Sequence, residues 1–367
     1  MKRSKLNYWG LILIVSLFAF ASCSDDDPIP NPPEPEKPPY YDYTCIVVNQ
    51  GNYTEANGTI AYYRESDNKV VVNAFQKAND RYLGSIVESV AVHDTIALVM
   101  CNNSDKIEII DVRSAKIYVD PIKGDDVVTP RYAVMNDKYA YVSCWGKYEN
   151  YTYPNSYLLK IDLNTKEIVK KIKCGDEAEG VLLVGNKLYV AVSGGIEVYD
   201  TSSDTKTGSI NNKTMYGSAK QMRIDKNNKM WYSVINYIES PQGIIVADLS
   251  TLTVEKEILV EGFMGSHFCL NKDKTKVYFY SYTNDENWAQ ETSSVYTIEV
   301  TTKTISENPV FEGEYFYGLD VNPQSGLFYT AEVYGFTANS KVMLFNESGT
   351  VSKEFTAGVG ACRFVFY

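Results

Sequence analysis

Apolar and polar residues alternate along most of the chain, in short runs separated by acidic or amide-rich turns. Alternation with a period of two is typical of β-strands, because successive side chains point to opposite faces of a sheet. One arrangement recurs: a β-rich run, an acidic turn and a second run. It is clearest at residues 106–120, 156–173, 195–210 and 243–259, with weaker copies at 59–75, 294–306 and 341–356.

A second hairpin precedes every copy except the first, as at residues 88–101 and 131–144. The repeating unit is therefore four strands over about 46 residues, close to the length of a propeller blade. The first copy has only three strands, whereas one spare strand, residues 362–367, ends the sequence. The pattern thus predicts an all-β fold, a seven-bladed β-propeller of four-stranded antiparallel blades, closed by pairing of the C-terminal strand with the N-terminal strands.

The N-terminal region differs in composition. Basic residues precede an apolar run at 11–21, as in a secretory signal peptide rather than a spanning helix. The small residues before Cys23 resemble a bacterial lipobox, in which the cysteine is lipidated; ordinary cleavage with a free Cys23 is the alternative. Residues 24–27, SDDD, are either an export tag or a solvated acidic run, and residues 28–39 form a proline-rich spacer. We expect a lipoprotein signal peptide at 1–22, the lipidated cysteine, tag and linker at 23–42, and the propeller at 43–367.

Charge and cysteine spacing limit the partners. The formal net charge is −11, and removal of the basic signal peptide leaves about −14, which repels the phosphates of nucleic acid. Six scattered cysteines follow Cys23 and lack the close pairs of a zinc site. Buried thiols are favoured, and one or two disulfides stay open as an alternative for an exported protein. We expect no cofactor, no metal and no nucleic-acid partner.

Four aspartates stand at matching places in their copies and could suggest a ring of catalytic carboxylates. Each is closely followed by Ser, Thr or Asn. An Asp side chain readily accepts hydrogen bonds from the backbone of its own turn. We therefore interpret these residues as structural: Asp111, Asp162, Asp200 and Asp248.

The strands of a blade are named A to D outward from the axis. Antiparallel order places all B–C loops and D–A connections on one face of the ring. Several B–C loops are long and aromatic, above all residues 145–155 within SCWGKYENYTYPNSY. Loops on a rigid scaffold commonly bind ligands, and Tyr and Trp supply large contact areas with few rotors. These aromatics could instead only order the loops or form a protein-docking surface.

Loop position predicts a set of ligand-binding residues on this face. They are Arg131, Tyr132, Trp145, Tyr148, Tyr151, Tyr153, Gln221, Tyr237, His267, Trp288, Tyr317 and Tyr334.

Catalysis has little support in the sequence. The chain has two histidines and no metal-ligand cluster, phosphate-binding loop or nucleophile elbow. His267 begins an A strand, where a lone histidine is more often a hydrogen-bonding wall residue than a base. We expect no catalytic residues and no enzyme, with a propeller lyase as the alternative.

Together with Cys23 and the SDDD run, the blades at 104–113 and 155–166 resemble the YncE-like propeller lipoproteins of the Bacteroidetes. Further similarity lies at 49–54, at 317–327 and in the closing segment 358–367. Within that group the chain looks like the vitamin B12-binding BtuG family.

The resemblance implies a lipid-anchored protein of the outer membrane, facing the cell exterior. It also implies binding of a corrinoid or similar bulky nutrient, and its delivery to a TonB-dependent transporter like BtuB. An adhesin or glycan-binding propeller is the alternative, since tyrosine and tryptophan platforms also stack on sugar rings. Blade motifs specify architecture more strongly than ligand.

Overall fold

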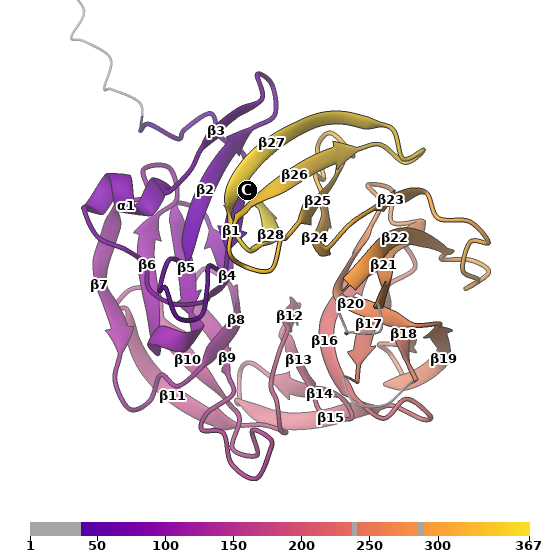
Figure 1. The fold of residues 1–367 in the computed structure, drawn as a ribbon. Helices are drawn as coiled ribbons and strands as arrows, with labels where there is room; N and C mark the ends of the chain where they lie inside the picture. The colour runs from indigo at the N-terminus through magenta and orange to yellow at the C-terminus, as the bar shows by residue number, and fades with distance from the viewer. Residues whose placement is uncertain (1–37, 237–240, 285–289) are drawn as a thin grey trace, which may run out of the picture. The chain divides into compact units, whose positions relative to one another are not determined.

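A computed structural model describes residues 38–236, 241–284 and 290–367. Seven four-stranded antiparallel sheets follow one another around a ring (Figure 1). The predicted seven-bladed propeller is therefore confirmed. The signal peptide, Cys23 and the acidic run lie outside the described residues, as do Tyr237 and Trp288.

The first four blades are given from the innermost strand outward. Blade 1 contains β28 (Ala361–Phe366), β1 (Cys45–Asn49), β2 (Thr59–Arg64) and β3 (Lys69–Val71). Blade 2 contains β4 (Val87–His93), β5 (Ile96–Cys101), β6 (Lys106–Asp111) and β7 (Ile117–Lys123). Blade 3 contains β8 (Pro130–Met135), β9 (Tyr139–Cys144), β10 (Tyr157–Asp162) and β11 (Glu167–Lys173). Blade 4 contains β12 (Val181–Val184), β13 (Lys187–Val192), β14 (Gly195–Asp200) and β15 (Thr205–Asn211).

The remaining three blades have the same order. Blade 5 contains β16 (Ser218–Ile224), β17 (Lys229–Ile235), β18 (Gln242–Asp248) and β19 (Thr253–Val260). Blade 6 contains β20 (Phe263–Leu270), β21 (Lys276–Asn284), β22 (Gln290–Glu299) and β23 (Phe311–Gly313). Blade 7 contains β24 (Phe316–Val321), β25 (Phe328–Glu332), β26 (Asn339–Phe345) and β27 (Val351–Val359).

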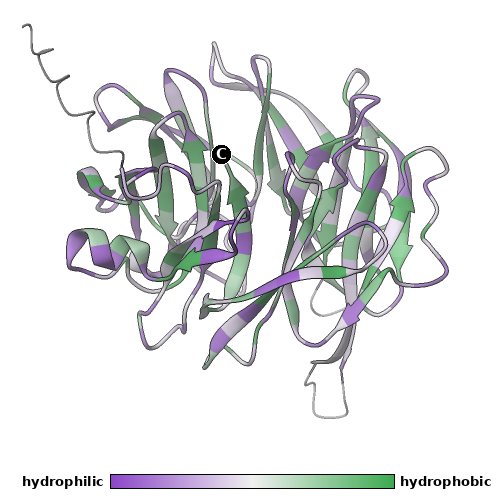
Figure 2. Ribbon diagram, turned by 90° about the horizontal axis from the view of Figure 1, so that it is seen from above, coloured by the Kyte–Doolittle hydropathy of each residue, from purple (hydrophilic) through white to green (hydrophobic). Residues whose placement is uncertain are grey.

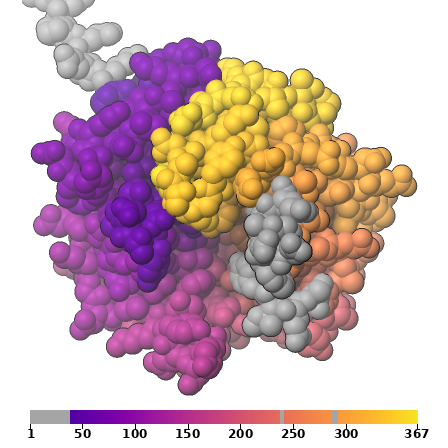
Figure 3. Space-filling view, in the orientation of Figure 1, coloured from indigo at the N-terminus to yellow at the C-terminus, as the bar shows by residue number. Residues whose placement is uncertain are grey.

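Blade 1 joins the two ends of the described body. β28 pairs antiparallel with β1, from Cys45 opposite Phe366 to Asn49 opposite Ala361. Figure 3 shows the consequence end-on, with the C-terminal yellow segment beside the N-terminal indigo segment. Pairing removes the two open edges that an unclosed ring would expose.

The core lies between neighbouring blades, and β1 shows how alternation builds it. Cys45 and Val47 pack toward blade 7, whereas Ile46 and Val48 pack toward blade 2. All five residues of β1 are buried, because each face of a blade is covered by the next blade. Figure 2 shows apolar residues concentrated in the strands and polar residues in many of the connections.

The outer hairpins of several blades share one shape because their turns are built around the predicted aspartates. Asp248 Oδ1 accepts hydrogen bonds from Ser250 N at 2.7 Å and Thr251 N at 3.1 Å. Asp111, Asp162 and Asp200 accept equivalent backbone bonds. These bonds lower the pKa of the Asp162 carboxyl, so the turn is stabilised by the charged form. The structural interpretation of the four aspartates is confirmed.

Three local features differ from the expected pattern. The first repeat ends in a helix, α1 (Ala74–Asn79), which follows the short strand β3, whose last residue is Val71. A 3-10 turn, η1 (Asn102–Ser104), follows β5. The outermost strand of blade 6 lies at Phe311–Gly313 rather than within residues 303–306, where only an isolated bridge from Ile305 to Ile298 forms.

The N-terminal edge of the described body includes residues assigned above to the linker. The body extends from Pro38 to Tyr367. Tyr40 is buried, and its ring stacks on Tyr62 with the ring centres 4.3 Å apart. These contacts place part of the 23–42 segment against the propeller.

The six cysteines of the described body are all free and buried. The prediction of buried thiols is therefore confirmed over the disulfide alternative. Among the described residues, no helix has the length and apolarity needed to cross a membrane.

Candidate ligand-binding face and axial site

Exposed tyrosines gather on the face that carries the B–C loops and D–A connections. Eight tyrosines of the described residues are strongly exposed. Tyr118 lies on the outer strand β7 and Tyr41 near the N-terminal edge of the body. The other six lie on the loop face, and they are Tyr53, Tyr82, Tyr148, Tyr151, Tyr216 and Tyr334.

The loop between β9 and β10 divides its aromatic residues between two tasks. The Arg131 guanidinium lies 3.9 Å from the ring centre of Trp145, and Trp145 lies 4.3 Å from Tyr153. Tyr148 follows at 5.1 Å from Tyr153 and is 60% exposed, whereas Tyr151 is 94% exposed. Trp145 and Tyr153 therefore order the loop, and Tyr148 and Tyr151 present aromatic surface to solvent.

Polar side chains also converge on the propeller axis, at the start of the inner strands. In six blades the pairing of the inner strand with its neighbour shifts register within its first residues. The shifts fall between Ala361 and Arg363, Val87 and Ser89, Pro130 and Ala133, Ala219 and Met222, Met264 and Phe268, and Phe316 and Leu319. A bulge of this kind re-aims side chains. The displaced residues include Glu88, Arg131, Tyr132, Lys220, Gln221, His267 and Tyr317.

Buried serines on the second strands bond the backbone that the bulges free. Tyr132 N donates to Ser143 Oγ at 3.1 Å, and Ser143 Oγ donates to Glu179 O at 2.6 Å. Gln221 N likewise donates to Ser233 Oγ at 3.1 Å. Buried backbone groups left unpaired would destabilise the fold, so these serines let the inner strands bulge.

A buried ion network links three of these blades. Arg131 donates to Glu88 at 2.8 Å through Nη1 and to Glu179 at 3.0 Å through Nε. Lys220 Nζ lies 2.9 Å from Glu179, and Tyr132 Oη donates to Glu88 at 2.7 Å. The side chains of Glu88 and Glu179 are only 5% and 3% exposed. Each carboxylate is thus paired, as a buried charge must be.

The pKa shifts follow from this pairing. Burial alone would raise the pKa of Glu179, but Arg131 and Lys220 outweigh burial and hold the pKa below its usual range. Burial would likewise lower the pKa of Arg131, yet Glu179 and Glu88 hold it well above its ordinary value. Glu179 and Arg131 are therefore both held in their charged forms near neutral pH.

His267 stands in this environment as a neutral imidazole. Burial first, and then the charge of Arg363, hold the pKa of His267 well below its usual range. Its Nδ1 lies 2.9 Å from the carbonyl oxygen of Tyr317, which can only accept, so Nδ1 carries the proton. Nε2 is thereby left as a hydrogen-bond acceptor. The imidazole acts as a hydrogen-bonding wall residue in this geometry.

Ten of the twelve predicted site residues can be placed. Five lie at the axis: Arg131, Tyr132, Gln221, His267 and Tyr317. Five lie in loops: Trp145, Tyr148, Tyr151, Tyr153 and Tyr334. Tyr317 Oη donates to Gln50 Oε1 at 2.9 Å, and Gln50 Nε2 lies 3.3 Å from Glu88, so the axial group continues into the first blade.

The sequence reasoning missed several axial residues. They are Gln50, Glu88, Glu179, Lys220, Arg223, Asp320 and Arg363. A signal was present for some of them, since polar pairs stand near the start of several inner runs, as in Glu88-Ser89 and Lys220-Gln221.

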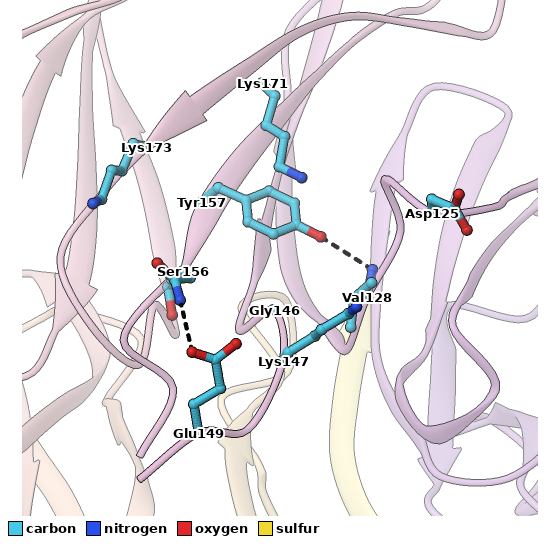
Figure 4. A pocket seen from close by; sticks show the side chains of 10 residues that line it. Asp125, Val128, Gly146, Lys147, Glu149, Ser156, Tyr157, Lys171 and Lys173 are labelled. Atoms are coloured by element: carbon cyan, nitrogen blue, oxygen red, sulfur yellow. Dashed lines mark hydrogen bonds between the residues drawn. The ribbon is translucent and has the colours of Figure 1, made fainter.

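A separate pocket of about 460 Å³ lies beside the 145–155 loop (Figure 4). Lys171 Nζ sits 3.8 Å from the ring centre of Tyr157, whose hydroxyl accepts from Val128 N and donates to Asp126 O. Lysines and carboxylates both line it, as at Lys173 and Glu149. It flanks blade 3 rather than the axis. No group of metal-ligating side chains occurs anywhere in the residues that the structure describes.

No family model matches the chain, and no curated protein does. Solved structures do match. A quinoprotein alcohol dehydrogenase-like protein from Bacteroides thetaiotaomicron superposes with a TM-score of 0.63 at 13% identity, covering 89% of this chain and 78% of its own. A protein of unknown function from Desulfotomaculum acetoxidans gives 0.63 at 12% identity, covering 88% and 98%.

A putative 6-phosphogluconolactonase from Bacteroides fragilis gives a TM-score of 0.60 at 11% identity, with coverage of 90% and 100%. At these identities the similarity shows a shared propeller fold and nothing more. The names attached to these structures also differ from one another, so they indicate no single ligand or reaction.

Proposed function

We propose that the protein is a non-enzymatic receptor that captures a bulky, amide-rimmed nutrient, a corrinoid of the vitamin B12 type, on its loop face. The observation that carries the proposal is the gathering of six exposed tyrosines on this face, around an axial group rich in hydrogen-bonding side chains. The YncE-like and BtuG-like resemblance of the sequence supports the same ligand class.

The chemistry of the face suits such a ligand. A corrinoid is wide and partly apolar, so tyrosine rings can cover its surface. Its amide rim needs both donors and acceptors, and the axis supplies both types in Tyr132, Gln221 and His267. A preformed ring of loops loses little conformational freedom on binding, which favours affinity.

Under this proposal the lipidated Cys23 anchors the protein to the outer membrane, facing outward. The linker holds the propeller at a distance from the membrane, and the captured ligand passes to a TonB-dependent transporter. The strongly acidic chain fits a partner other than nucleic acid or anionic lipid surface.

The test is calorimetric titration of cyanocobalamin into protein produced without residues 1–23. We expect saturable binding in the micromolar range or tighter. The double variant Tyr148→Ala/Tyr151→Ala removes two exposed rings, and we expect affinity to fall by about ten- to a hundredfold, at about 1 kcal/mol or more per ring.

Tyr118→Ala is the matched control, because Tyr118 is 56% exposed but lies on outer strand β7. It should bind as the unaltered protein does. Folded protein that shows no heat with cyanocobalamin at micromolar concentrations would exclude the corrinoid. Binding on a glycan array that is lost in the same double variant would favour the glycan-binding alternative instead.

A further inference from the structure

Arg131 is one of the residues that the sequence predicts to bind the ligand, but the structure surrounds its polar groups. Its side chain is 12% exposed. Nη1 donates to Glu88 at 2.8 Å, while Nε and Nη2 donate to the two carboxylate oxygens of Glu179 at 3.0 and 3.1 Å. All three guanidinium nitrogens are thus paired with buried carboxylates. The two-pronged bond to Glu179 fixes the plane of the guanidinium as well as its position.

A row of aromatic rings begins at this guanidinium. The guanidinium carbon lies over the ring of Trp145, 3.9 Å from the ring centre. Tyr153 follows at 4.3 Å from Trp145, and Tyr148 at 5.1 Å from Tyr153. Tyr148, at the far end, is 60% exposed. The row therefore joins the axis to the exposed surface of the 145–155 loop.

Contacts of its ring, rather than side-chain hydrogen bonds, hold Trp145. Its Nε1 is buried and, within the described residues, has no hydrogen-bond partner. A cation is attracted to the negative face of an indole ring, and more strongly where water is excluded. Lys220 Nζ lies farther from the ring centre, at 5.6 Å. The contact with Arg131 is therefore the main electrostatic interaction that fixes this side chain.

The tip of the loop requires support from outside, because its own backbone is strained. Asn150 and Tyr151 have φ values of 50° and 64°. These values lie in the left-handed region, which is unfavourable for a residue with a large side chain. Glu149 N donates to Thr152 O at 2.9 Å, and Thr152 N donates to Glu149 O at 3.1 Å. These two bonds close the tip on itself and do not connect it to the strands.

Glu177 and the aromatic row connect the tip to the body of the propeller. Glu177 N donates to Tyr153 O at 3.2 Å, and Glu177 Oε1 accepts from Thr152 Oγ1 at 3.3 Å. These bonds hold the backbone and a hydroxyl group. The row links the ring of Tyr148 to the axis, so the position of that ring depends on Arg131.

We infer that Arg131 is a positioning residue of the loop face. It holds the 145–155 loop in its binding conformation through Trp145, and it does not touch the captured ligand. To reach Arg131, a ligand would have to displace Trp145 or break the pairs with Glu88 and Glu179. The inference rests on the proposed function for its ligand, whereas the order of the loop can be measured without one.

The test compares Arg131→Lys with the wild type by hydrogen–deuterium exchange and by calorimetric titration of cyanocobalamin. Lysine keeps the positive charge between Glu88 and Glu179, but it has neither a planar group nor paired N–H groups. We expect amide exchange in residues 145–155 to rise by about tenfold or more, because local opening becomes easier. The affinity for cyanocobalamin should fall by about tenfold.

A double-mutant cycle separates positioning from direct contact. The second variant is Tyr148→Ala/Tyr151→Ala, which removes the exposed rings of the loop. In this background Arg131→Lys should change the affinity by less than about twofold, because the rings through which Arg131 acts are gone. A residue that touches the ligand itself would lower the affinity equally in both backgrounds.

Arg64→Lys is the matched control. Arg64 also donates through two nitrogens to one carboxylate, that of Asp67, at 2.9 and 2.7 Å, and it lies 4.9 Å from the ring centre of Tyr43. It precedes the turn between β2 and β3, on the face opposite the long loops. The substitution should leave both the exchange in residues 145–155 and the affinity unchanged.

If Arg131→Lys does not fold, Trp145→Ala removes the same contact from the loop side and leaves the ion pairs in place. It should give the same rise in exchange and the same non-additivity. Unchanged exchange in residues 145–155, an unchanged affinity, or an equal loss of affinity in both backgrounds would each overturn the inference. Wild-type protein that binds no cyanocobalamin would contradict the receptor proposal alone, because the exchange rates still decide whether Arg131 positions the loop.

Discussion

Replacing Glu179 with glutamine tests whether the axial network is a structural necessity. Glu179 is 3% exposed and joins Arg131, 12% exposed, to Lys220, 8% exposed. The substitution keeps the shape of the side chain but leaves Arg131 with Glu88 as its carboxylate partner and removes the carboxylate that lies 2.9 Å from Lys220 Nζ. Removing one partner of a buried ion pair typically costs about 3–5 kcal/mol of unfolding free energy.

The expected melting shift follows from the size of the folded body. For the residues from Pro38 to Tyr367, the entropy of unfolding is about 0.7 kcal/mol/K, so a loss of about 3–5 kcal/mol lowers the melting temperature by about 4–7 °C. Differential scanning calorimetry at pH 7 measures it. Glu354→Gln is the control, because Glu354 pairs with Lys341 at 2.9 Å while both are more than two-fifths exposed. That pair should contribute less than about 1 kcal/mol, or about 1 °C.

The pH dependence has a definite sign. The folded-state pKa of Glu179 is lowered, so its contribution to stability is complete above the ordinary glutamate pKa of about 4.3. The contribution disappears as the pH falls through the lower folded-state pKa. The difference between wild type and Glu179→Gln should therefore be constant from pH 8 to pH 6 and shrink in acid. Equal melting shifts for Glu179→Gln and Glu354→Gln, or a difference that grows in acid, would refute the reasoning.

Other consequences can be measured separately. Trp145→Ala should make the 145–155 loop sensitive to limited proteolysis, because the Trp145 ring packs against Arg131. Tyr151→Ala should change the unfolding free energy by less than about 0.5 kcal/mol, because Tyr151 is exposed. Equal protease sensitivity of the two variants would contradict this division. Burial raises the pKa of the Cys101 and Cys362 thiols to about 12, so a thiol reagent such as DTNB should leave them unmodified at pH 8 until denaturant is added. The His267 imidazole should show an Nδ1-protonated spectrum without a titration step between pH 8 and pH 5, since its pKa is well below the usual range; a midpoint inside that window would be inconsistent with the buried site.

Much of the fold could be predicted because it repeats. The turn chemistry acts within single hairpins. Asp162 and Asp248, for example, accept hydrogen bonds only two residues away, so each turn can be predicted without reference to distant residues. Counting strands then required the spare C-terminal strand to pair with the first blade. The position of β23 was less predictable, because an outermost strand is short and half exposed and its pattern is weak.

The axial site was harder to predict because its residues come from all around the ring. Glu88, Glu179 and Lys220 each look like an ordinary polar residue at the start of a strand. Bulges in blades 2 and 5, together with the residues that lead into β12, bring them to within 3.1 Å of Arg131 or of one another. The loop aromatics predicted the same face, but Trp145 and Tyr153 pack against each other and order the 145–155 loop.

The pairing of β28 with β1 also sets the order in which the molecule can form. Strand β2 can pair with β1, and β3 with β2, as soon as they emerge, but the inner edge of β1 has no partner until residues 361–366 have been synthesised. Loop closure over such a separation is slow compared with hairpin formation. The β1 edge therefore stays open until the last strand is available, and the ring closes only at the final step of folding.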